Sequence, residues 1–345
     1  MVKYTIQRLI LAVVTAFIIL TATFFLIKTL PFEKPIGMAE NLYAFYNKQV
    51  ALGYLVDVEQ EDPNLGEMLW TFTDTAGLTH CFYQKSIPEQ YAVWISGLFN
   101  GFNWGTSHFI SPNVDAMVII GERLPTTIKV NIWPVLISVP TGIGLGIWAA
   151  LKKNKMTDHI ISTLVMVFIS VPSFIVITLL MLWLCYQNRI LPSQFPSQSA
   201  DGFTQFKGYI IPTMALSFGS ICGYCRFTRA ELTEVMSSDF LLLARTKGLT
   251  RSQAIVRHAL KNAFVPILPS ILAEVIALLG GAMILEQLYG IPGVGKLYVT
   301  ALNQKDYNVL MADMGFYTII GLISGVFLDL SYGFIDPRIR MGARK

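Results

Sequence analysis

A glycine-rich stretch at 290–296, GIPGVGK, is the part of the chain that comes closest to a nucleotide-binding motif. Its seven residues fit the start of a phosphate-binding loop, in which backbone N–H groups surround phosphates and a lysine reaches the terminal ones. The eighth position needs the hydroxyl of Ser or Thr to hold Mg²⁺, and here it is Leu297. An apolar run, and no strand pattern, precedes the stretch. We therefore interpret it as a turn and expect this chain to bind no nucleotide or other cofactor.

Cysteine and histidine, the other residue types suited to catalysis or metal binding, form no recognisable pattern. The chain has four of each. Cys222 and Cys225 form a CxxC at the end of an apolar run, without a second pair, so packing between helices explains them best. The histidines are scattered, and neither HExxH nor GxSxG occurs. We expect no catalytic residue and no metal site.

Three carboxylates lie within long apolar runs: Glu274, Asp313 and Asp329. Charged groups in such surroundings are costly and often functional. Glu274, together with Gly280 and Gly281, is our candidate for the lining of a substrate pathway. The alternative is an interhelical contact, for example an ion pair between Asp329 and Arg229.

The overall composition is typical of an integral membrane protein. Hydrophobic residues make up 53% of the 345 positions, charged residues 14%, and the mean hydropathy is +0.54. The run 9–30 has 22 residues and one charge, and as a helix it would extend about 33 Å, enough to cross a bilayer core. It is too long for a signal peptide, so we predict a retained first span. Five more spans are predicted at 126–151, 160–186, 208–226, 264–289 and 309–334.

Small residues and prolines inside these runs predict how the helices pack. Glycines recur at 142, 144 and 146 in the second run and would let neighbouring backbones approach closely. Pro172 in the third run and Pro212 in the fourth would kink their helices.

The distribution of Lys and Arg predicts the orientation. Six spans place both termini on one side of the membrane, with the segments 152–155 and 226–261, and these regions hold 16 of the 26 basic residues. The segment 31–125 on the other side has 4 basic residues against 11 acidic ones. We therefore place both termini in the cytoplasm and the segment 31–120 outside. The net charge of +4 reflects this asymmetry and gives no indication of nucleic-acid binding.

A strongly basic stretch, ARTKGLTRSQAIVRHALKN at 244–262, contains five Lys or Arg, one His and no acidic residue. Eight charged side chains lie between 231 and 261, so placing this region in the bilayer would cost roughly 20–28 kcal/mol. We predict a cytoplasmic loop. Its first part would be a short helix capped by Ser237 or Ser238 and anchored by the three leucines at 241–243.

The second part of the loop has the sequence pattern of a helix end followed by a helix start. Gly248 is placed to end the short helix in a left-handed conformation. Thr250 and Gln253 fit a capping box, which would begin a second helix from Arg251 to about Phe264.

Two interpretations of this loop are open. It is either a topology signal that rests on anionic lipid or a docking helix for a cytoplasmic partner. The fixed turn at Gly248 favours docking, because a charge anchor needs no defined turn.

Seven motifs stand in order along the chain: YTIQRL at 4–9, GERLPTT at 121–127, SVPSF at 170–174, RFTRA at 226–230, DFLLLARTKGL at 239–249 with RHALKNA at 257–263, EQLYGIPGVG at 286–295 and DPRIR at 336–340. Together they resemble the motifs of ABC importer permeases of the oligopeptide, dipeptide and nickel branch, in particular the first of the two permease subunits. The resemblance covers residues 1–30 and 121–345.

The resemblance implies an all-α membrane protein with six transmembrane helices of the type I ABC importer permease fold and an extracytoplasmic insertion between helices 1 and 2. Residues 1–30 would form the N-terminal cytoplasmic segment and first helix, and 31–120 the extracytoplasmic segment. Residues 121–335 would form a five-helix core with a cytoplasmic coupling loop at 231–263. Residues 336–345 would be a cytoplasmic tail.

The resemblance also implies that the chain performs no chemistry. It would form half of the pore of an ATP-driven importer of di- or oligopeptides in the bacterial plasma membrane. The implied partners are a second homologous permease chain, two ABC ATPase subunits that carry ATP and Mg²⁺, an extracytoplasmic substrate-binding protein and membrane lipid. The ATPase contact would lie at 238–250, with these residues: Asp239, Ala244, Arg245, Lys247, Gly248 and Thr250.

The sequence departs from the family in three places. PFEKP at 31–35 replaces a Pro-Gly-Asp-Pro-like turn, and HALK at 258–261 stands where the wider importer motif has Ile-x-Leu-Pro. The segment 36–115 is longer than the usual connection. It is either a small external cap that meets the binding protein or a packing insertion.

Other transport classes stay open at this point. Nickel and other small-solute permeases of the same branch share these motifs. An ATP-independent secondary transporter would need internal repeats and paired intramembrane charges, and neither is clear. A membrane-embedded hydrolase would need a nucleophile and base, and no such set is evident.

Overall fold

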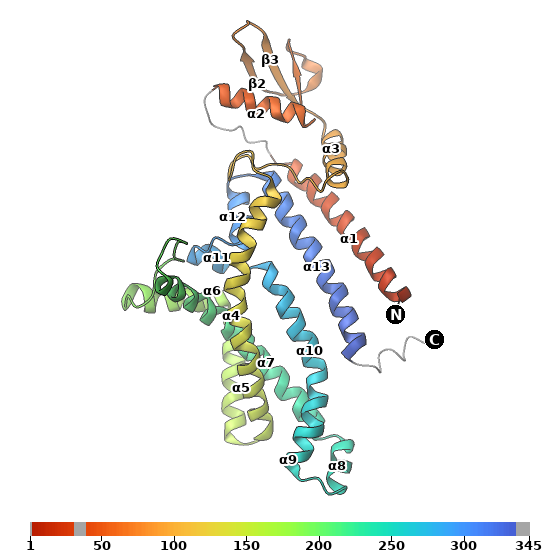
Figure 1. Cartoon of the computed structure of the whole chain (residues 1–345), viewed down its shortest axis with the longest axis vertical. Helices are drawn as coiled ribbons and strands as arrows, with labels where there is room; N and C mark the ends of the chain where they lie inside the picture. The colour runs from red at the N-terminus through yellow and green to blue at the C-terminus, as the bar shows by residue number, and fades with distance from the viewer. Residues whose placement is uncertain (1, 31–38, 336–345) are drawn as a thin grey trace. The chain divides into compact units, whose positions relative to one another are not determined.

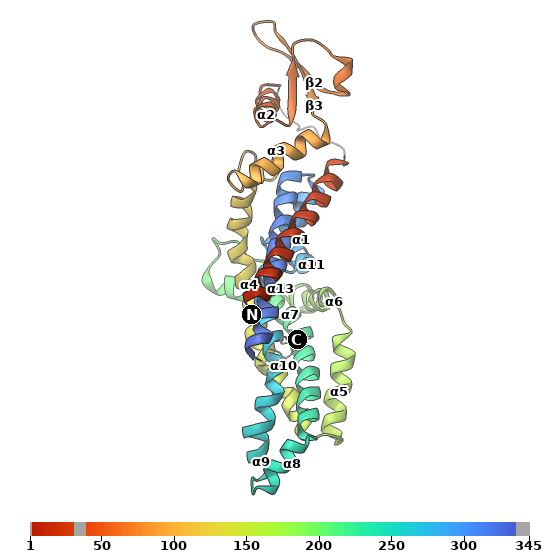
Figure 2. The ribbon, with the colours of Figure 1, turned by 90° about the vertical axis from the view of Figure 1, so that its right-hand side faces the viewer.

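The computed structural model describes residues 2–30 and 39–335 and is largely helical (Figures 1 and 2). Its long helices are α1 (Val2–Lys28), α4 (Ala116–Leu151), α5 (Met156–Ile169), α7 (Gly202–Met236), α10 (Leu260–Ala277) and α13 (Tyr307–Ile335). The described chain divides into two compact units. The helical unit contains residues 2–12, 123–297 and 320–335, and the mixed unit contains 13–30, 39–122 and 298–319.

Several helices are suited to a membrane. Within the described residues, four are long and apolar enough to cross one: Thr5–Lys28, Ala116–Leu151, Arg251–Gly280 and Tyr307–Ser331. The bent pair Met156–Ile169 and Ser173–Gln187 is a fifth candidate if it is one span. α7 lies at the position of the fourth predicted span but is not apolar enough to count as one, because its apolar residues alternate with Gly, Ser, Thr and Tyr. A multi-pass helical protein is therefore confirmed, and the number of six spans stays a prediction.

The third predicted span, 160–186, is not one continuous helix. α5 ends at Ile169, and α6 (Ser173–Leu180) with the π-helical η2 (Met181–Gln187) continues at an angle of 92°. Pro172 is the N-cap of α6, and proline both lacks a backbone donor and disfavours helix in the preceding residue. The expected kink at Pro172 is thus a sharp break, whereas Pro212 lies inside an unbroken α7.

The fifth predicted span, 264–289, ends earlier than expected. α10 continues through η4 (Leu278–Gly280) and stops at Gly281, whose φ of 65° most side chains disfavour. Two short helices follow, α11 (Met283–Tyr289) and α12 (Val294–Asn303), and they are separated by the GIPG turn. The stretch GIPGVGK is therefore a turn between helices.

Close packing of α4 on α7 depends on two of the three predicted glycines. A Cβ on Gly142 would lie 2.6 Å from the Cβ of Tyr224, and one on Gly146 would lie 2.7 Å from the carbonyl oxygen of Cys225. A Cβ on Gly144 would meet no atom within 4 Å, so the expectation for this residue was wrong. Helical periodicity explains the difference, because consecutive even positions cannot all face one neighbour.

The alternative for Asp329, an interhelical contact, is confirmed, but its partner is not the example Arg229. Arg229 on α7 instead donates two hydrogen bonds to the carboxylate of Asp158 on α5, at 2.5 and 2.8 Å. Asp329 pairs with Arg8 at 3.2 Å, which joins α13 to the start of α1. Sequence reasoning paired two groups from similar predicted depths, and this reasoning contains no information on which helices are neighbours.

The mixed unit contains a small sheet that the sequence analysis did not predict. α2 (Ala39–Ala51) is followed by β1 (Leu55–Val58), η1 (Pro63–Leu65), β2 (Met68–Thr73), β3 (Thr79–Gln84) and α3 (Ile87–Phe99). The strands are antiparallel in the order β1-β3-β2. α2 covers the sheet through Tyr46, which packs with the buried Leu55 and Phe82 and stacks on Trp70. This segment therefore has a hydrophobic core of its own.

A second set of contacts joins the loop 104–115 to the junction of α12 and α13. Asp306 is fully buried and accepts hydrogen bonds from the hydroxyl of Ser107 and from the backbone N–H groups of residues 108–110. The Nε2 atom of His108 lies 3.2 Å from Nε2 of Gln49 and 3.1 Å from Nδ2 of Asn308. This part of the mixed unit is thus held by buried polar contacts.

Two predicted features lie outside the described residues. These are the PFEKP departure at 31–35 and the C-terminal segment 336–345, which includes the DPRIR motif.

Candidate functional site

The basic loop forms a short helix, as predicted. α8 (Asp239–Thr246) begins after Ser238, which occupies the N-cap position. The Ser238 hydroxyl does not cap the helix, because it donates to the backbone carbonyl of Val235 at 2.6 Å. The expected side-chain cap is therefore wrong, whereas Asp239 places a negative charge in the first turn, where the helix dipole favours it.

The end of α8 is fixed by a Schellman motif centred on Gly248. The N–H of Gly248 donates to the carbonyl of Arg245, and the N–H of Leu249 donates to the carbonyl of Ala244. Gly248 has a φ of 98°, which confirms the predicted left-handed glycine. The direction in which the chain leaves α8 is thus set by two hydrogen bonds and one glycine.

The second helix of the loop begins at the predicted capping box. The Gln253 N–H donates to the Thr250 hydroxyl, and the Gln253 side-chain oxygen accepts from the Thr250 N–H. α9 (Arg251–Ala254) continues through a π-helical turn, η3 (Ile255–Ala259), into α10. Residues 251–280 therefore form one continuous helix of 30 residues that begins in the basic loop.

The apolar anchor of α8 is smaller than predicted. Only Leu241 of the three leucines is buried, with 5% of its surface exposed. It joins a cluster from α4, α7, α9 and η3 that includes Ala254 and, partly buried, Leu249. Leu242 and Leu243 are 60% and 56% exposed because successive helical residues point about 100° apart. With Phe240, 44% exposed, they leave an apolar surface on α8 next to its charged residues.

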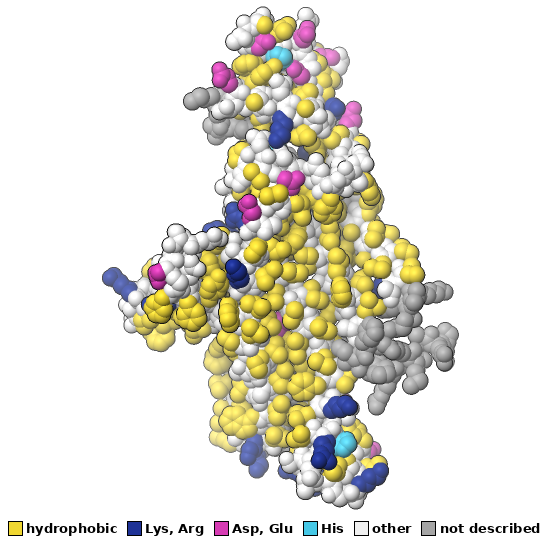
Figure 3. Space-filling view, viewed as in Figure 1, with side chains coloured by type: hydrophobic (Ala, Val, Ile, Leu, Met, Phe, Trp, Pro, Cys, Tyr) yellow, Lys and Arg dark blue, Asp and Glu magenta, His cyan; other side chains and the backbone are white. Residues whose placement is uncertain are grey.

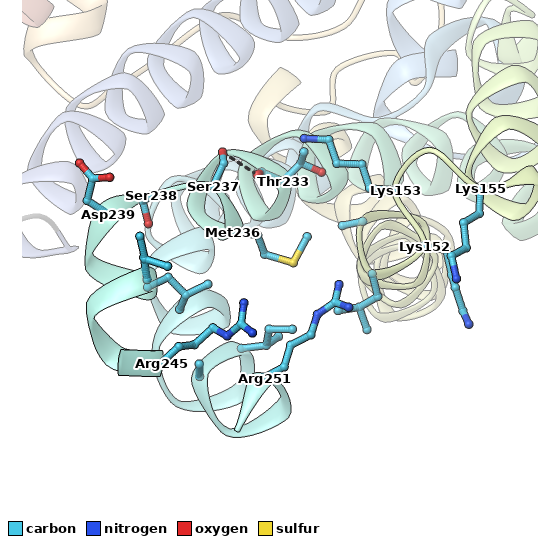
Figure 4. A pocket seen from close by; sticks show the side chains of 16 residues that line it. Lys152, Lys153, Lys155, Thr233, Met236, Ser237, Ser238, Asp239, Arg245 and Arg251 are labelled. Atoms are coloured by element: carbon cyan, nitrogen blue, oxygen red, sulfur yellow. Dashed lines mark hydrogen bonds between the residues drawn. The ribbon is translucent and has the colours of Figure 1, made fainter. Parts of the chain in front are cut away.

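A hollow of about 550 Å³ lies between this loop and the connection from α4 to α5 (Figure 4). Arg245 and Arg251 extend into it from α8 and α9, and three lysines at 152, 153 and 155 border it from the α4–α5 connection. Among the described residues that line it, Asp239 is the only carboxylate. In Figure 3, Lys and Arg side chains gather at this end of the helical unit, while hydrophobic side chains cover the visible face of its long helices. The hollow is thus a basic, partly apolar surface.

The predicted contact residues divide into two groups. Asp239 and Arg245 line the hollow, whereas Ala244, Lys247, Gly248 and Thr250 lie on α8 and its turn outside the hollow lining. The lysines of the α4–α5 connection were not among the predicted contacts. The KKNK pattern could have identified them, but sequence reasoning used it for topology alone.

The three predicted pathway residues lie near the end of one helix, with Glu274 about 9 Å along the axis from Gly280, and their contacts differ. Glu274 is half-buried on α10 and lies close enough to the Tyr224 hydroxyl on α7 to interact with it. Gly281 packs elsewhere, because a Cβ on it would lie 2.8 Å from Oε1 of Glu286. Gly280 is the last residue of η4.

Glu286 is the organised carboxylate that sequence reasoning missed. It is 1% exposed and accepts hydrogen bonds from the backbone N–H groups of Ala282 and Lys296 and from the hydroxyl of Thr127 on α4. A Cβ on Gly293 would lie 2.3 Å from its Oε2. The GIPGVGK turn thus packs against a carboxylate of its own chain, and its Lys296 N–H donates to that carboxylate as backbone donors do to phosphate in other proteins. A lone Glu in an apolar run before several glycines was the available signal.

Comparisons with known proteins agree with this architecture. Residues 142–341 match the family model described as binding-protein-dependent transport system inner membrane component. The chain is 31% identical over 341 residues to the dipeptide transport system permease protein DppB of Lactococcus lactis, and the match covers 99% of this chain and 100% of the relative. It is 30% identical over 348 residues to the protein of the same name from Bacillus subtilis, with 99% of both chains covered.

More distant similarities point in the same direction. The oligopeptide transport system permease protein OppB of Escherichia coli is 27% identical over 340 residues, which covers 99% of this chain and 100% of the relative. Among solved structures, a chain of the inward-facing MetNI methionine ABC transporter matches with a TM-score of 0.50 and 14% identity, over 64% of this chain and 97% of that one. At this identity the structural likeness concerns the fold alone.

Proposed function

The chain belongs to the family of binding-protein-dependent transport system inner membrane components, and on this premise we propose that it is a permease subunit of an ATP-driven importer of dipeptides or oligopeptides. The observation that carries the proposal is the full-length similarity to permeases named for dipeptide and oligopeptide transport. A nickel permease or an ATP-independent transporter has no comparable support among these relatives.

In this proposal the chain itself is not an enzyme. ATP and Mg²⁺ bind to separate ATPase subunits, and a second permease chain completes the pore. The turn most similar to a phosphate-binding loop supports this division, because its Lys296 N–H already donates to the carboxylate of Glu286 and its Val294 N–H to the hydroxyl of Thr127. Energy must therefore reach the pore through a protein contact.

We assign the ATPase contact to α8 and the basic hollow beside it. The exposed Phe240 and Leu243 lie one helical turn apart and give α8 an apolar surface that a protein partner would bury. Arg245 adds a positive charge at the edge of the hollow. A topology signal would need only the charges, so the Schellman turn and the exposed apolar residues support docking.

The remaining assignments follow from orientation. We infer from the positive-inside rule that the basic hollow is cytoplasmic, and in this orientation both termini would be cytoplasmic and the segment 31–120 extracytoplasmic. This segment has its own core and exposes the acidic residues Glu59, Glu61 and Glu67. These features support an external cap for a substrate-binding protein. Glu274 remains our candidate pathway residue in α10.

Affinity purification of the full chain from its native membrane tests the proposal. We expect a second permease chain and ATPase subunits to co-purify. Arg245→Glu should reduce ATPase recovery by about tenfold or more, because charge reversal converts attraction into repulsion. Lys261→Glu is the matched control, since Lys261 is an exposed cation on the helix that follows α8 but outside the hollow. A chain that purifies alone would overturn the proposal.

A further inference from the structure

A second hollow lies between α5 and α7, on the surface of the helical unit. It has a volume of about 440 Å³. One end is polar, with His159 from α5 and Arg226 and Arg229 from α7, and the other is apolar, with Val165 and Met166 from α5. We call this feature the α5–α7 groove. Its two ends differ in chemistry in the same way as the two ends of an amphipathic molecule.

The two arginines of the groove are in different electrostatic states. Asp158, which is 1% exposed, accepts from Nε and one terminal nitrogen of Arg229 and neutralises it. Arg226 is exposed, and in the described part of the chain no hydrogen bond or ion pair to it is present. The polar end of the groove therefore carries one uncompensated positive charge.

The depth of Arg226 can be estimated from its neighbours. Arg229 is level with Asp158, the third residue of α5, because the two side chains are bonded. Arg226 lies three residues away on the same helix, about 4.5 Å at 1.5 Å per residue. In α7 this is the direction away from the basic loop, towards the membrane interior. An arginine at this depth can reach the phosphate layer, whereas a free charge further inside would be much more costly.

We propose that the α5–α7 groove binds an anionic phospholipid. The phosphate lies against Arg226, with His159 as an additional hydrogen-bonding group, and an acyl chain follows Val165 and Met166. From His159 to Met166 the groove extends seven residues along α5, about 10 Å, which is enough for the upper part of an acyl chain. Basic pockets between membrane helices near the cytoplasmic surface are typical sites for anionic headgroups.

An anionic lipid fits both the polar and the apolar end of the groove, whereas each other occupant considered fits only one end. A soluble anion would use Arg226 but leave Met166, which is 65% exposed, without a partner. A neutral lipid would cover Met166 but leave the charge of Arg226 uncompensated. The second permease chain could cover the groove in the assembled complex, and the experiment below includes this outcome.

Native mass spectrometry of the purified complex tests the proposal. Phosphatidylglycerol and phosphatidylcholine with identical acyl chains would be added to the delipidated complex in turn. We expect preferential retention of phosphatidylglycerol, and a loss of about tenfold or more in Arg226→Gln, as when a hydrogen bond to a charged group is removed. Arg226→Lys should restore most of the preference. Lys261→Gln is the control, because Lys261 is an exposed cation outside both the groove and the basic hollow.

A second measurement keeps Arg226 unchanged and therefore does not depend on the folding of the Arg226 variants. A photoreactive cross-linker on a cysteine introduced at Met166 should label an acyl chain in the assembled complex. Labelling of the second permease chain instead would overturn the proposal, as would equal retention of both lipids or unchanged retention in Arg226→Gln.

Discussion

Gly248 provides a direct test of whether the geometry of α8, and not only its charge, is needed for the proposed ATPase contact. Its φ of 98° is disfavoured for any residue with a Cβ, at a cost of about 1–2 kcal/mol. A Cβ at this position would meet no atom within 4 Å, so Gly248→Ala adds strain without a steric clash. If the backbone relaxed to a negative φ instead, it would lose both Schellman hydrogen bonds, at about 0.5–1.5 kcal/mol each. The variant is therefore destabilised whether it keeps the strained φ or relaxes.

The consequence of Gly248→Ala should be local. A cost of about 1–2 kcal/mol is small beside a typical stability of 5–15 kcal/mol, so the chain should still fold and reach the membrane. The same cost lowers the ratio of the docking geometry to relaxed geometries by about 5–30-fold, and the apparent affinity for the ATPase should fall by up to this factor. Titration of purified ATPase subunits onto the permease pair, followed by fluorescence anisotropy, would measure it.

Two matched variants separate backbone strain from other effects. Gly248→Asn should lose less affinity than Gly248→Ala, because Asn tolerates left-handed conformations better than other residues with a Cβ. Gly219→Ala on α7 should be neutral, since a Cβ there also meets no atom within 4 Å and its φ is not positive. Wild-type affinity in Gly248→Ala would refute the reasoning, and equal losses in the Ala and Asn variants would point to a direct contact.

Three further predictions concern other parts of the chain. Gly315→Ala should prevent stable folding of the mixed unit, because its Cβ would lie 2.0 Å from the buried indole of Trp104; protein yield and tryptophan fluorescence would show it. Burial, opposed by Asp306 and assisted by Lys28 and Lys48, lowers the pKa of His108 to about 4. Because the unfolded chain protonates His108 at a higher pH than the folded chain does, acid favours unfolding. The free energy of unfolding should be unaffected above about pH 6.5 and should fall as pH drops towards 4, by about 2 kcal/mol at pH 5. His108→Gln should flatten this pH profile in thermal unfolding. Glu274→Gln should change peptide uptake without reducing recovery of the assembled complex; unchanged uptake across substrates would exclude it from the pathway.

Local sequence signals predicted the loop well because each depends on neighbouring residues only. Gly248 and the Thr250 capping box involve backbone groups within four residues of themselves, and both were confirmed. Leu242 and Leu243 were misjudged for a related reason. Hydrophobicity marks them as anchors, but only the orientation of α8 against its neighbours decides that Leu241 is the one inside.

Long-range contacts could not be predicted because they depend on which helices are neighbours. Asp158 bonds Arg229 across 71 positions, and Thr127 reaches Glu286 across 159. The sheet was missed for a different reason. Its strands are four to six residues long, and short apolar segments give little periodicity with which to tell strand from loop.

The helix from Arg251 to Gly280 connects the two organised sites of the helical unit. It begins directly after the turn that positions α8 and ends at Gly281, next to the carboxylate of Glu286. At 1.5 Å per residue its 30 residues extend about 45 Å, more than the thickness of a bilayer core. A displacement of α8 can therefore reach the far end of the unit through one continuous element, and the π-helical turn at 255–259 and the prolines at 266 and 269 are where it can bend. Because Glu286 and Thr127 hold the end of this helix against α4, we expect motion that begins at α8 to be transmitted there to α4.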